Sequence, residues 1–200
     1  FVGLAGAVVV LNDNSDTKAF VGDAISSDLA SVIKSAGSVN ISAVSDVSVQ
    51  ASTLGAAGTL VGAALGAAVT IVNLQGDTSA VVGDYTRVGD EQATTPNVGN
   101  VNVAASATTS VGGFVDVGDT SPMAVGLAVS AGGSGAAGVA LVTTDMNVDA
   151  TIGEEADIDA SGVVSVDATS NHDIQMDADG GAVGAIIGVG AMIAEAKILG

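Results

Sequence analysis

Apolar and polar residues alternate in three short segments of the chain, residues 39–43, 101–105 and 164–168. In each segment every second residue is apolar, and Val and Ile predominate at these positions. Side chains of a strand point alternately to its two faces, so a period of two with β-branched residues on one side is typical of a half-buried strand. The pattern therefore predicts strands. One exception is expected at residues 28–35, which fit a short amphipathic turn.

Three longer apolar stretches, residues 54–72, 123–142 and 180–193, follow the same alternation. One side of each stretch holds mostly Val, Leu and Ile, and the other holds mostly Gly and Ala. We expect the branched side to form the core and the small side to let another backbone layer approach closely. That layer is expected to be another sheet, an adjoining filament or a second chain. The predicted lateral packing face consists of Gly58, Gly62, Ala64, Gly66, Gly126, Ala128, Ser130, Gly184 and Gly188.

Glycines four residues apart also fit the small-residue packing of membrane helices. They are Gly58, Gly62 and Gly66 in the first stretch and Gly180, Gly184 and Gly188 in the third. The flanks hold almost no Lys or Arg and no aromatic belt, and Asp or Glu lies close by. Because four is an even period, a strand explains the spacing equally well. A membrane partner is therefore disfavoured, and a glycine-zipper membrane oligomer is the alternative of another class.

Two short phrases recur in the same order along the chain. The first reads TKAFVGD at 17–23, TSAVVGD at 78–84 and VDATIGE at 148–154, and the second reads GSVNISA at 37–43, GNVNVAA at 99–105 and GVVSVDA at 162–168. The glycines that open the second phrase are 62 (99 − 37) and 63 (162 − 99) residues apart, so the unit has about 62 residues. Differences in spacing place loop insertions within 23–36 and 84–98 and near 116–123.

Repeats built from strands, with their length differences confined to loops, are typical of a solenoid. We predict an all-β fold, a parallel β-solenoid (β-helix) of about three repeats of roughly 62 residues, as a single segment over 1–200. The approximate repeats are 1–53, 54–122 and 123–179, and 180–200 starts a fourth. Because the chain begins at Phe1 without Met, a processed chain or a piece of a longer one is expected.

The composition narrows the function further. The formal charge is −18, with four Lys and Arg against 22 Asp and Glu, which excludes a nucleic-acid surface. Apolar residues make up 48% of the chain, so it is expected to fold, while aromatic residues at 2% indicate thin layers of Val, Ala and Ile. The chain has no cysteine, which excludes disulfides and thiol chemistry and leaves the redox compartment open.

The order of these elements resembles the repeats of large bacterial filamentous adhesins of the leukotoxin/haemagglutinin type. The shared order is a Gly/Ala-rich apolar strand, a polar turn, T-x-A-x-x-G-[DE], an insertion, and G-x-V-x-[VI]-x-A. The resemblance covers nearly the whole chain through short, degenerate motifs. It implies a secreted, parallel β-helical stalk at the cell surface. The scarcity of Lys and Asn and the excess of Asp depart from the usual pattern and suggest a saline or calcium-containing setting.

No catalytic constellation is found in the sequence. His172 is the only histidine and is expected in a solvated turn, and the Gly-rich runs lack the Lys and Ser/Thr of a phosphate loop. Carboxylates within 12–16 and 157–179 offer the oxygen ligands that Ca²⁺ takes, but without EF-hand spacing. A solvated acidic face that keeps filaments apart is the expected role, and structural Ca²⁺ is the alternative. We predict no enzyme and no catalytic, cofactor-binding or metal-ligating residue.

These observations predict a non-catalytic extracellular filament segment, the stalk of a surface adhesin. The alternative within the same fold is a subunit that polymerises end to end into a structural fibre. The expected partners are other copies, through the solenoid ends and the Gly/Ala face, and a ligand of the cell surface or matrix, which the inserted loops would bind.

Overall fold

The computed structural model describes residues 1–22, 24–90, 95–113 and 123–199, and these residues form β-strands joined by turns. The prediction of an all-β chain is confirmed. The strands are β1 (Val2–Asn14), β2 (Thr17–Val21), β3 (Val32–Ile33), β4 (Ala36–Gln50), β5 (Thr53–Thr59), β6 (Ala63–Val82), β7 (Arg87–Val88), β8 (Val98–Gly112), β9 (Ala124–Ser130), β10 (Gly133–Ile152), β11 (Asp157–Ile158), β12 (Val164–Ile174), β13 (Ala178–Gly184) and β14 (Ile187–Leu199).

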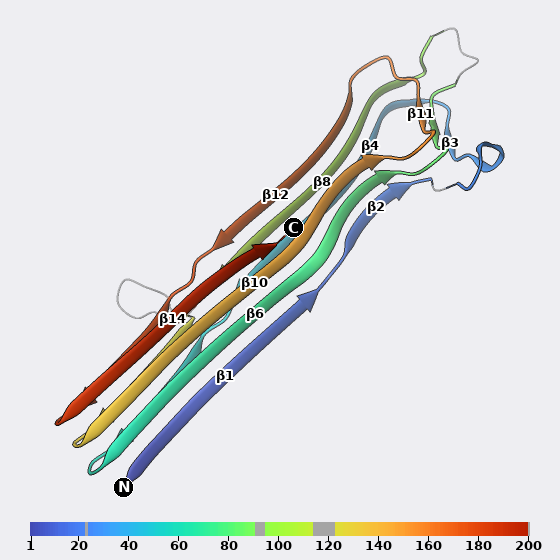
Figure 1. The fold of residues 1–200 in the computed structure, drawn as a ribbon. Coiled ribbons are helices and arrows are strands. Elements are labelled where there is room, and N and C mark those ends of the chain that lie inside the picture. The colour runs from blue at the N-terminus through green and yellow to red at the C-terminus, as the bar shows by residue number, and fades with distance from the viewer. Residues whose placement is uncertain (23, 91–94, 114–122, 200) are drawn as a thin grey trace.

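Four sheets contain these strands, and every pairing within them is parallel (Figure 1). Sheet A has the order β1-β6-β10-β14, with β2 continuing beside β6. Sheet B consists of β3, β7 and β11, sheet C of β4, β8 and β12, and sheet D of β5, β9 and β13. Each strand therefore lies beside the strand that holds the equivalent place one repeat later.

The path of the chain through one repeat explains this order. β6 runs the length of sheet A, β7 lies beyond its end, and β8 and β9 return along sheets C and D to the turn that leads into β10 (Figure 1). The register sets Val2 beside Ala63, Ala64 beside Ser134, and Gly133 beside Ile187. These steps are 61 (63 − 2), 70 (134 − 64) and 54 (187 − 133) residues long. The strands keep their register although the repeats differ in length, so the differences lie in the connections.

The two recurring phrases lie side by side in the structure. Ala19 and Ala150, from the first and third copies of the first phrase, flank Ala80 in sheet A. In the second phrase, Val39 and Val164 flank Val101 in sheet C. After the first phrase the chain turns through a left-handed residue at equivalent places, Tyr85 with φ 54° and Glu155 with φ 53°. The repeated letters therefore mark repeated backbone geometry.

The space between the facing sheets is filled differently at its two ends. Towards sheet B the buried residues are mainly Val and Ile, including Val39, Ile41, Val82 and Val103. Towards the β5–β6 turn the buried cluster is made of alanines, namely Ala64, Ala128 and Ala136. Side-chain volume sets how far apart two packed layers lie. The second region therefore brings the sheets closer together than the first.

Three local expectations need correction or comment. Residues 28–35 do not form the expected amphipathic turn, because the structure has a 3-10 turn at Ser27–Leu29 followed by β3. His172 is a half-buried residue of β12, not part of a solvated turn. The insertion expected near 116–123 lies outside the described residues except for Met123, which is buried.

Candidate interaction surface

The predicted packing face lies inside the chain, between sheets A and D. Ala64, Gly66, Gly126, Ala128 and Ser130 are buried. At the turns Gly62 and Gly184 are half-buried, and Gly188 on the edge strand β14 is exposed. Gly58 does not belong to this face, because it lies in register with Val129 on the outer side of sheet D and is exposed. Of the three covers that the sequence left open, the structure shows another sheet of the same chain. Association with a second chain through the buried residues would require the two sheets to separate.

Close approach of the two backbones explains why this interior is built from small residues. A Cβ atom on Gly126 would collide with the backbone of Ala137, and one on Gly66 would collide with the carbonyl oxygen of Leu127. Sheets that carry branched side chains between them pack about 10 Å apart, which leaves room for those side chains. Sheets A and D leave no such room along most of their length, so Gly, Ala and Ser predominate between them, with Thr53 and Thr59 at the two ends of β5.

Most branched residues of the apolar stretches consequently point outward, which corrects the expectation that they form the core; Val72 and Val142, at the ends of their stretches, are buried. Leu4 is 71% exposed, Leu65 is 52% exposed, and on the opposite face Val129 is 56% exposed. A strand that turns its small side inward must turn its branched side outward, because successive side chains alternate. This surface is what sequence reasoning missed. The size difference between the two sides was visible, but it does not say which side faces in.

On sheet A the outward residues form rows across the strands, and their polarity changes at one level. Moving from the turns towards sheet B, the outward rows begin apolar and include the row Val8, Val69, Val139 and Ile193. The row of Val10, Ile71, Leu141 and Glu195 is the last mainly apolar one, and the next is Asn12, Asn73, Thr143 and Lys197. Within one step of the alternation the surface changes from apolar to polar.

The opposite face changes at the same level. Sheet D exposes Leu54, Leu127 and Val129, whereas sheet C exposes residues such as Asn40, Ser42, Asp46, Asp167 and Asn171. The boundary between the two sheets is tied to sheet A by hydroxyl groups. Thr70 Oγ1 donates to the Met123 carbonyl oxygen at 2.5 Å and lies 2.6 Å from Thr53 Oγ1. Both faces therefore share one level of polarity change, which we call the girdle.

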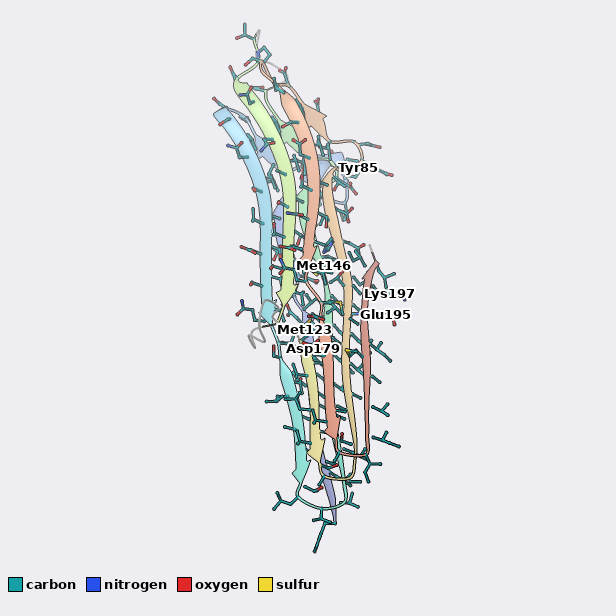
Figure 2. All side chains as sticks on the ribbon, turned by 90° about the vertical axis from the view of Figure 1, so that its left-hand side faces the viewer. Tyr85, Met123, Met146, Asp179, Glu195 and Lys197 are labelled. Carbon is teal, nitrogen blue, oxygen red and sulfur yellow. The ribbon has the colours of Figure 1, made fainter. Side chains whose placement is uncertain are left out.

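We call the part of the molecule below the girdle the apolar half, made of residues 1–11, 53–72, 123–142 and 178–194. These segments contain a single charged residue, Asp179, which lies in register with Leu54 and Val125 next to the girdle. The turns at the far end are apolar as well, with Leu60 92% exposed and Ile186 78% exposed. Figure 2 shows the contrast, because the side chains at its lower end are nearly all carbon, whereas many of those at its upper end carry oxygen.

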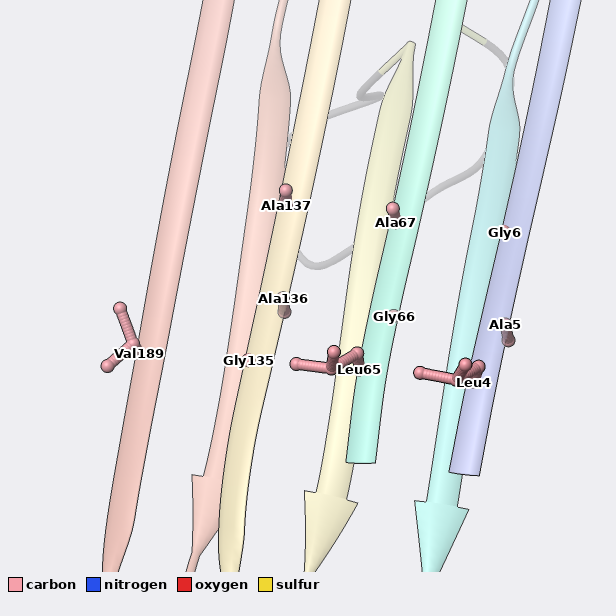
Figure 3. Close-up of a pocket in the computed structure, with 10 residues that line it drawn as sticks. All are labelled: Leu4, Ala5, Gly6, Leu65, Gly66, Ala67, Gly135, Ala136, Ala137 and Val189. Atoms are coloured by element: carbon pink, nitrogen blue, oxygen red, sulfur yellow. The ribbon is translucent and has the colours of Figure 1, made fainter. Parts of the chain in front are cut away.

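A shallow hollow lies on the outer face of sheet A within the apolar half (Figure 3). Its volume is about 560 Å³, and residues of β1, β6, β10 and β14 line it. Leu4, Leu65 and Val189 stand along one line, with Gly135 between the last two. The side chain of Leu65 leans over Gly135, where a Cβ atom would lie 2.9 Å from Leu65 Cδ2. No lining residue is polar, so the hollow suits an apolar occupant.

The other part of the molecule, the polar half, carries most of the acidic residues. Asp16 accepts a hydrogen bond from the Asp77 backbone N–H at 3.0 Å and lies 3.6 Å from Lys18 Nζ. Asp77 accepts from Asn147 at 3.1 Å. Among the described residues no group of three or more Asp, Glu, His or Cys could hold a metal ion. Hydrogen bonds thus hold Asp16 and Asp77 to the neighbouring repeat.

Comparison with known proteins adds no assignment. No family model, no curated protein and no solved structure matches the chain. Within the described residues no helix has the length and apolar character needed to cross a membrane, and the three apolar stretches form strands. The function must therefore be inferred from the in-register repeats, the open strand edges and the apolar half.

Proposed function

We propose that the chain is a non-catalytic structural segment of an extracellular filament, built as a parallel β-solenoid. The observation that carries this proposal is the register: the strands of sheets A, B, C and D each lie in parallel beside their equivalents in the next repeat. Such an arrangement extends by adding repeats, because each new repeat pairs with the preceding one and needs no other support. The solenoid axis then runs across the strands.

Side-chain ladders support this stacking. Asn73 Nδ2 donates to Asn12 Oδ1 at 2.8 Å, and Ser165 Oγ donates to Asn102 Oδ1 at 2.7 Å. Both bonds join equivalent positions of neighbouring repeats, which the register places side by side. Ladders of this kind recur where similar units stack in register. The sequence phrases that resemble filamentous adhesins support a stalk at the cell surface as the setting.

The alternative, a subunit that polymerises end to end, is favoured by the edges of sheet A. β1 and β14 are its first and last strands, and the described part of the chain adds no strand to their outer edges. An unpaired parallel edge offers a row of N–H and C=O groups to an incoming strand. In a stalk the same chain would supply the next repeat, whereas in a polymer another copy would supply it.

A cysteine pair tests the stacked repeats directly, because the natural chain has no cysteine. In the variant Asn12→Cys/Asn73→Cys the two Cα atoms belong to adjacent strands, about 4.8 Å apart, which is within disulfide range. In the control Asn12→Cys/Gln75→Cys the second position is displaced by two residues, which places the Cα atoms about 8 Å apart, beyond that range. Rapid oxidation of the first pair alone is expected. Equal oxidation of both pairs would contradict the register.

Electron microscopy of the purified chain with a mass measurement separates stalk from polymer. A polymer should give rods that lengthen with concentration, and aligned rods should diffract near 4.8 Å along their axis. Ala191→Pro and Met192→Pro, made separately in β14, form a matched pair, because adjacent residues of a parallel strand direct their N–H groups to opposite sides. The proline that removes an N–H group from the outer edge of β14 should block lengthening while leaving the circular dichroism unchanged. The other proline removes an N–H group on the side of β10 and serves as its control. Particles of constant length at all concentrations would exclude the polymer and favour the stalk.

A further inference from the structure

We propose that the apolar half inserts into a lipid bilayer, turns first, while the polar half stays in water. This inference rests on the proposed stacking of repeats, which supplies partners for the edges of β1 and β14. Open strand edges are costly in hydrocarbon because their N–H and C=O groups have no water to bond. Neighbouring repeats or copies would pair those edges, so that only side chains face the lipid.

The two halves of the molecule place their large and small side chains on opposite sides. In the polar half Val and Ile fill most of the interior, and Asn, Asp, Ser and Thr share the surface with exposed apolar residues such as Phe20 and Val44. In the apolar half alanines fill the interior, while Leu65 and Val129 face outward on opposite sides. Small residues between packed elements and large apolar residues on the outside are the arrangement that lipid favours, since burial of large side chains gains nothing there.

The apolar surface has the shape expected of a part that enters a bilayer. It covers both faces and the turns, and it ends at one level, the girdle, on sheet A and between sheets C and D. A flat boundary around the molecule fits the plane where hydrocarbon meets water. The span from Val2 to Val10 covers eight residue-to-residue steps of β1 (10 − 2), about 26 Å, and the turns extend beyond it. This length is close to the hydrocarbon thickness of a bilayer, about 30 Å.

Charged residues are distributed unevenly between the two halves. Asp179, Glu195 and Lys197 lie near the girdle in Figure 2, and the other acidic residues that the structure describes lie in the polar half. None of the described charged residues would therefore enter the hydrocarbon beyond that level, where a single charge is costly. The net charge of −18 disfavours anionic lipid, so the expected partner is a bilayer of zwitterionic lipid.

A second copy packed on the hollow of sheet A is the competing occupant, and the area argues against it. Four strands about 4.8 Å apart and about 26 Å long give roughly 500 Å² of face. A stable interface buries about 800 Å² on each partner, so this face alone falls short. A dimer would also leave sheet D and the turns exposed. The sequence disfavoured membrane contact because the apolar stretches lack the Lys, Arg and aromatic flanks of membrane helices. The structure forms strands there instead, and it turns their branched side outward.

Flotation with phosphatidylcholine vesicles tests the proposal on the full chain, diluted from mild detergent. The wild type should float with the vesicles. The variant Leu65→Asp/Val129→Asp adds one charge to each apolar face, and we expect at least a tenfold lower vesicle-bound fraction. The matched control Gln75→Asp/Asn171→Asp adds the same charges to sheets A and C above the girdle and should float like the wild type. All four positions are exposed, so circular dichroism should show the same strand content.

Single cysteines carrying an environment-sensitive dye measure depth independently. Leu65→Cys and Val129→Cys should shift to blue emission on addition of vesicles, whereas Gln75→Cys should not. A chain that does not float, or a dye at position 65 that shifts blue without lipid as concentration rises, would overturn the proposal, the latter in favour of a second copy. Neither result affects the cysteine-pair test of stacking, so failure of lipid insertion and failure of the proposed function are distinguishable.

Discussion

Asn12 and Asn73, which are 61 (73 − 12) residues apart in sequence, are hydrogen-bonded side by side on sheet A at 2.8 Å. They belong to the first polar row beyond the girdle, where the surface stops being apolar. The pair thus marks both the register between repeats and the level at which water is expected to begin.

Removal of this bond should weaken the contact between the first two repeats. Asn73→Ala is expected to lower the free energy of unfolding by about 0.5–1.5 kcal/mol, the usual net contribution of one hydrogen bond. Urea denaturation of both single variants and of the double variant with Asn12→Ala gives the coupling between the two residues. A coupling of zero would show that the amides contribute independently and that the ladder does not stabilise the stack.

The close approach of sheets A and D predicts different effects for two glycines. Gly126→Ala should lower the free energy of unfolding by about 1–3 kcal/mol, because the added methyl group collides with the backbone of Ala137 and the sheets must separate. Gly6→Ala is the control, since nothing lies within 4 Å of its Cβ position on the outer face. It should be neutral or stabilising by about 0.5–1 kcal/mol. Equal effects in thermal denaturation would contradict the close packing.

Two buried threonines should also respond differently to valine. Thr70→Val removes the donor to the Met123 carbonyl oxygen and the hydroxyl beside Thr53, so we expect a loss of about 1–3 kcal/mol. Thr78 is equally buried, but its Oγ1 has no hydrogen-bond partner among the described residues. Thr78→Val should therefore be neutral or stabilising by about 1 kcal/mol, since it removes an unpaired polar atom from the interior. A similar loss for both would show that the girdle hydroxyls are not bonded as described.

The acidic surface predicts a dependence on salt. Like charges on the polar half repel one another, and the Debye length falls from about 30 Å at 0.01 M to about 3 Å at 1 M salt. The melting temperature should therefore rise with NaCl, by about 2–4 °C for each kcal/mol of relieved repulsion. Millimolar CaCl₂ at matched ionic strength separates screening from binding: a further rise that a chelator reverses would support structural Ca²⁺, and no further rise would remove it.

The sequence by itself determined the strands, their repetition and the places where length varies. Alternation with Val and Ile predicts strands locally, so the segments around Val39, Val101 and Val164 needed no tertiary information. The two recurring sequence phrases identified the repeats that lie side by side, because equivalent positions of stacked repeats contact the same neighbours. The separation of large and small side chains in the apolar stretches was also visible in the sequence.

Only the tertiary structure decided which side of those stretches faces in. A period of two defines two faces of a strand, but it does not determine the distance to the opposing layer. Where sheets A and C are separated by Val and Ile, the large side faces in. Where sheets A and D approach so closely that Gly126 meets the backbone of Ala137, only the small side fits, and Leu65 and Val129 turn outward. That backbone separation, set between segments far apart in sequence, made the apolar half a surface rather than a core.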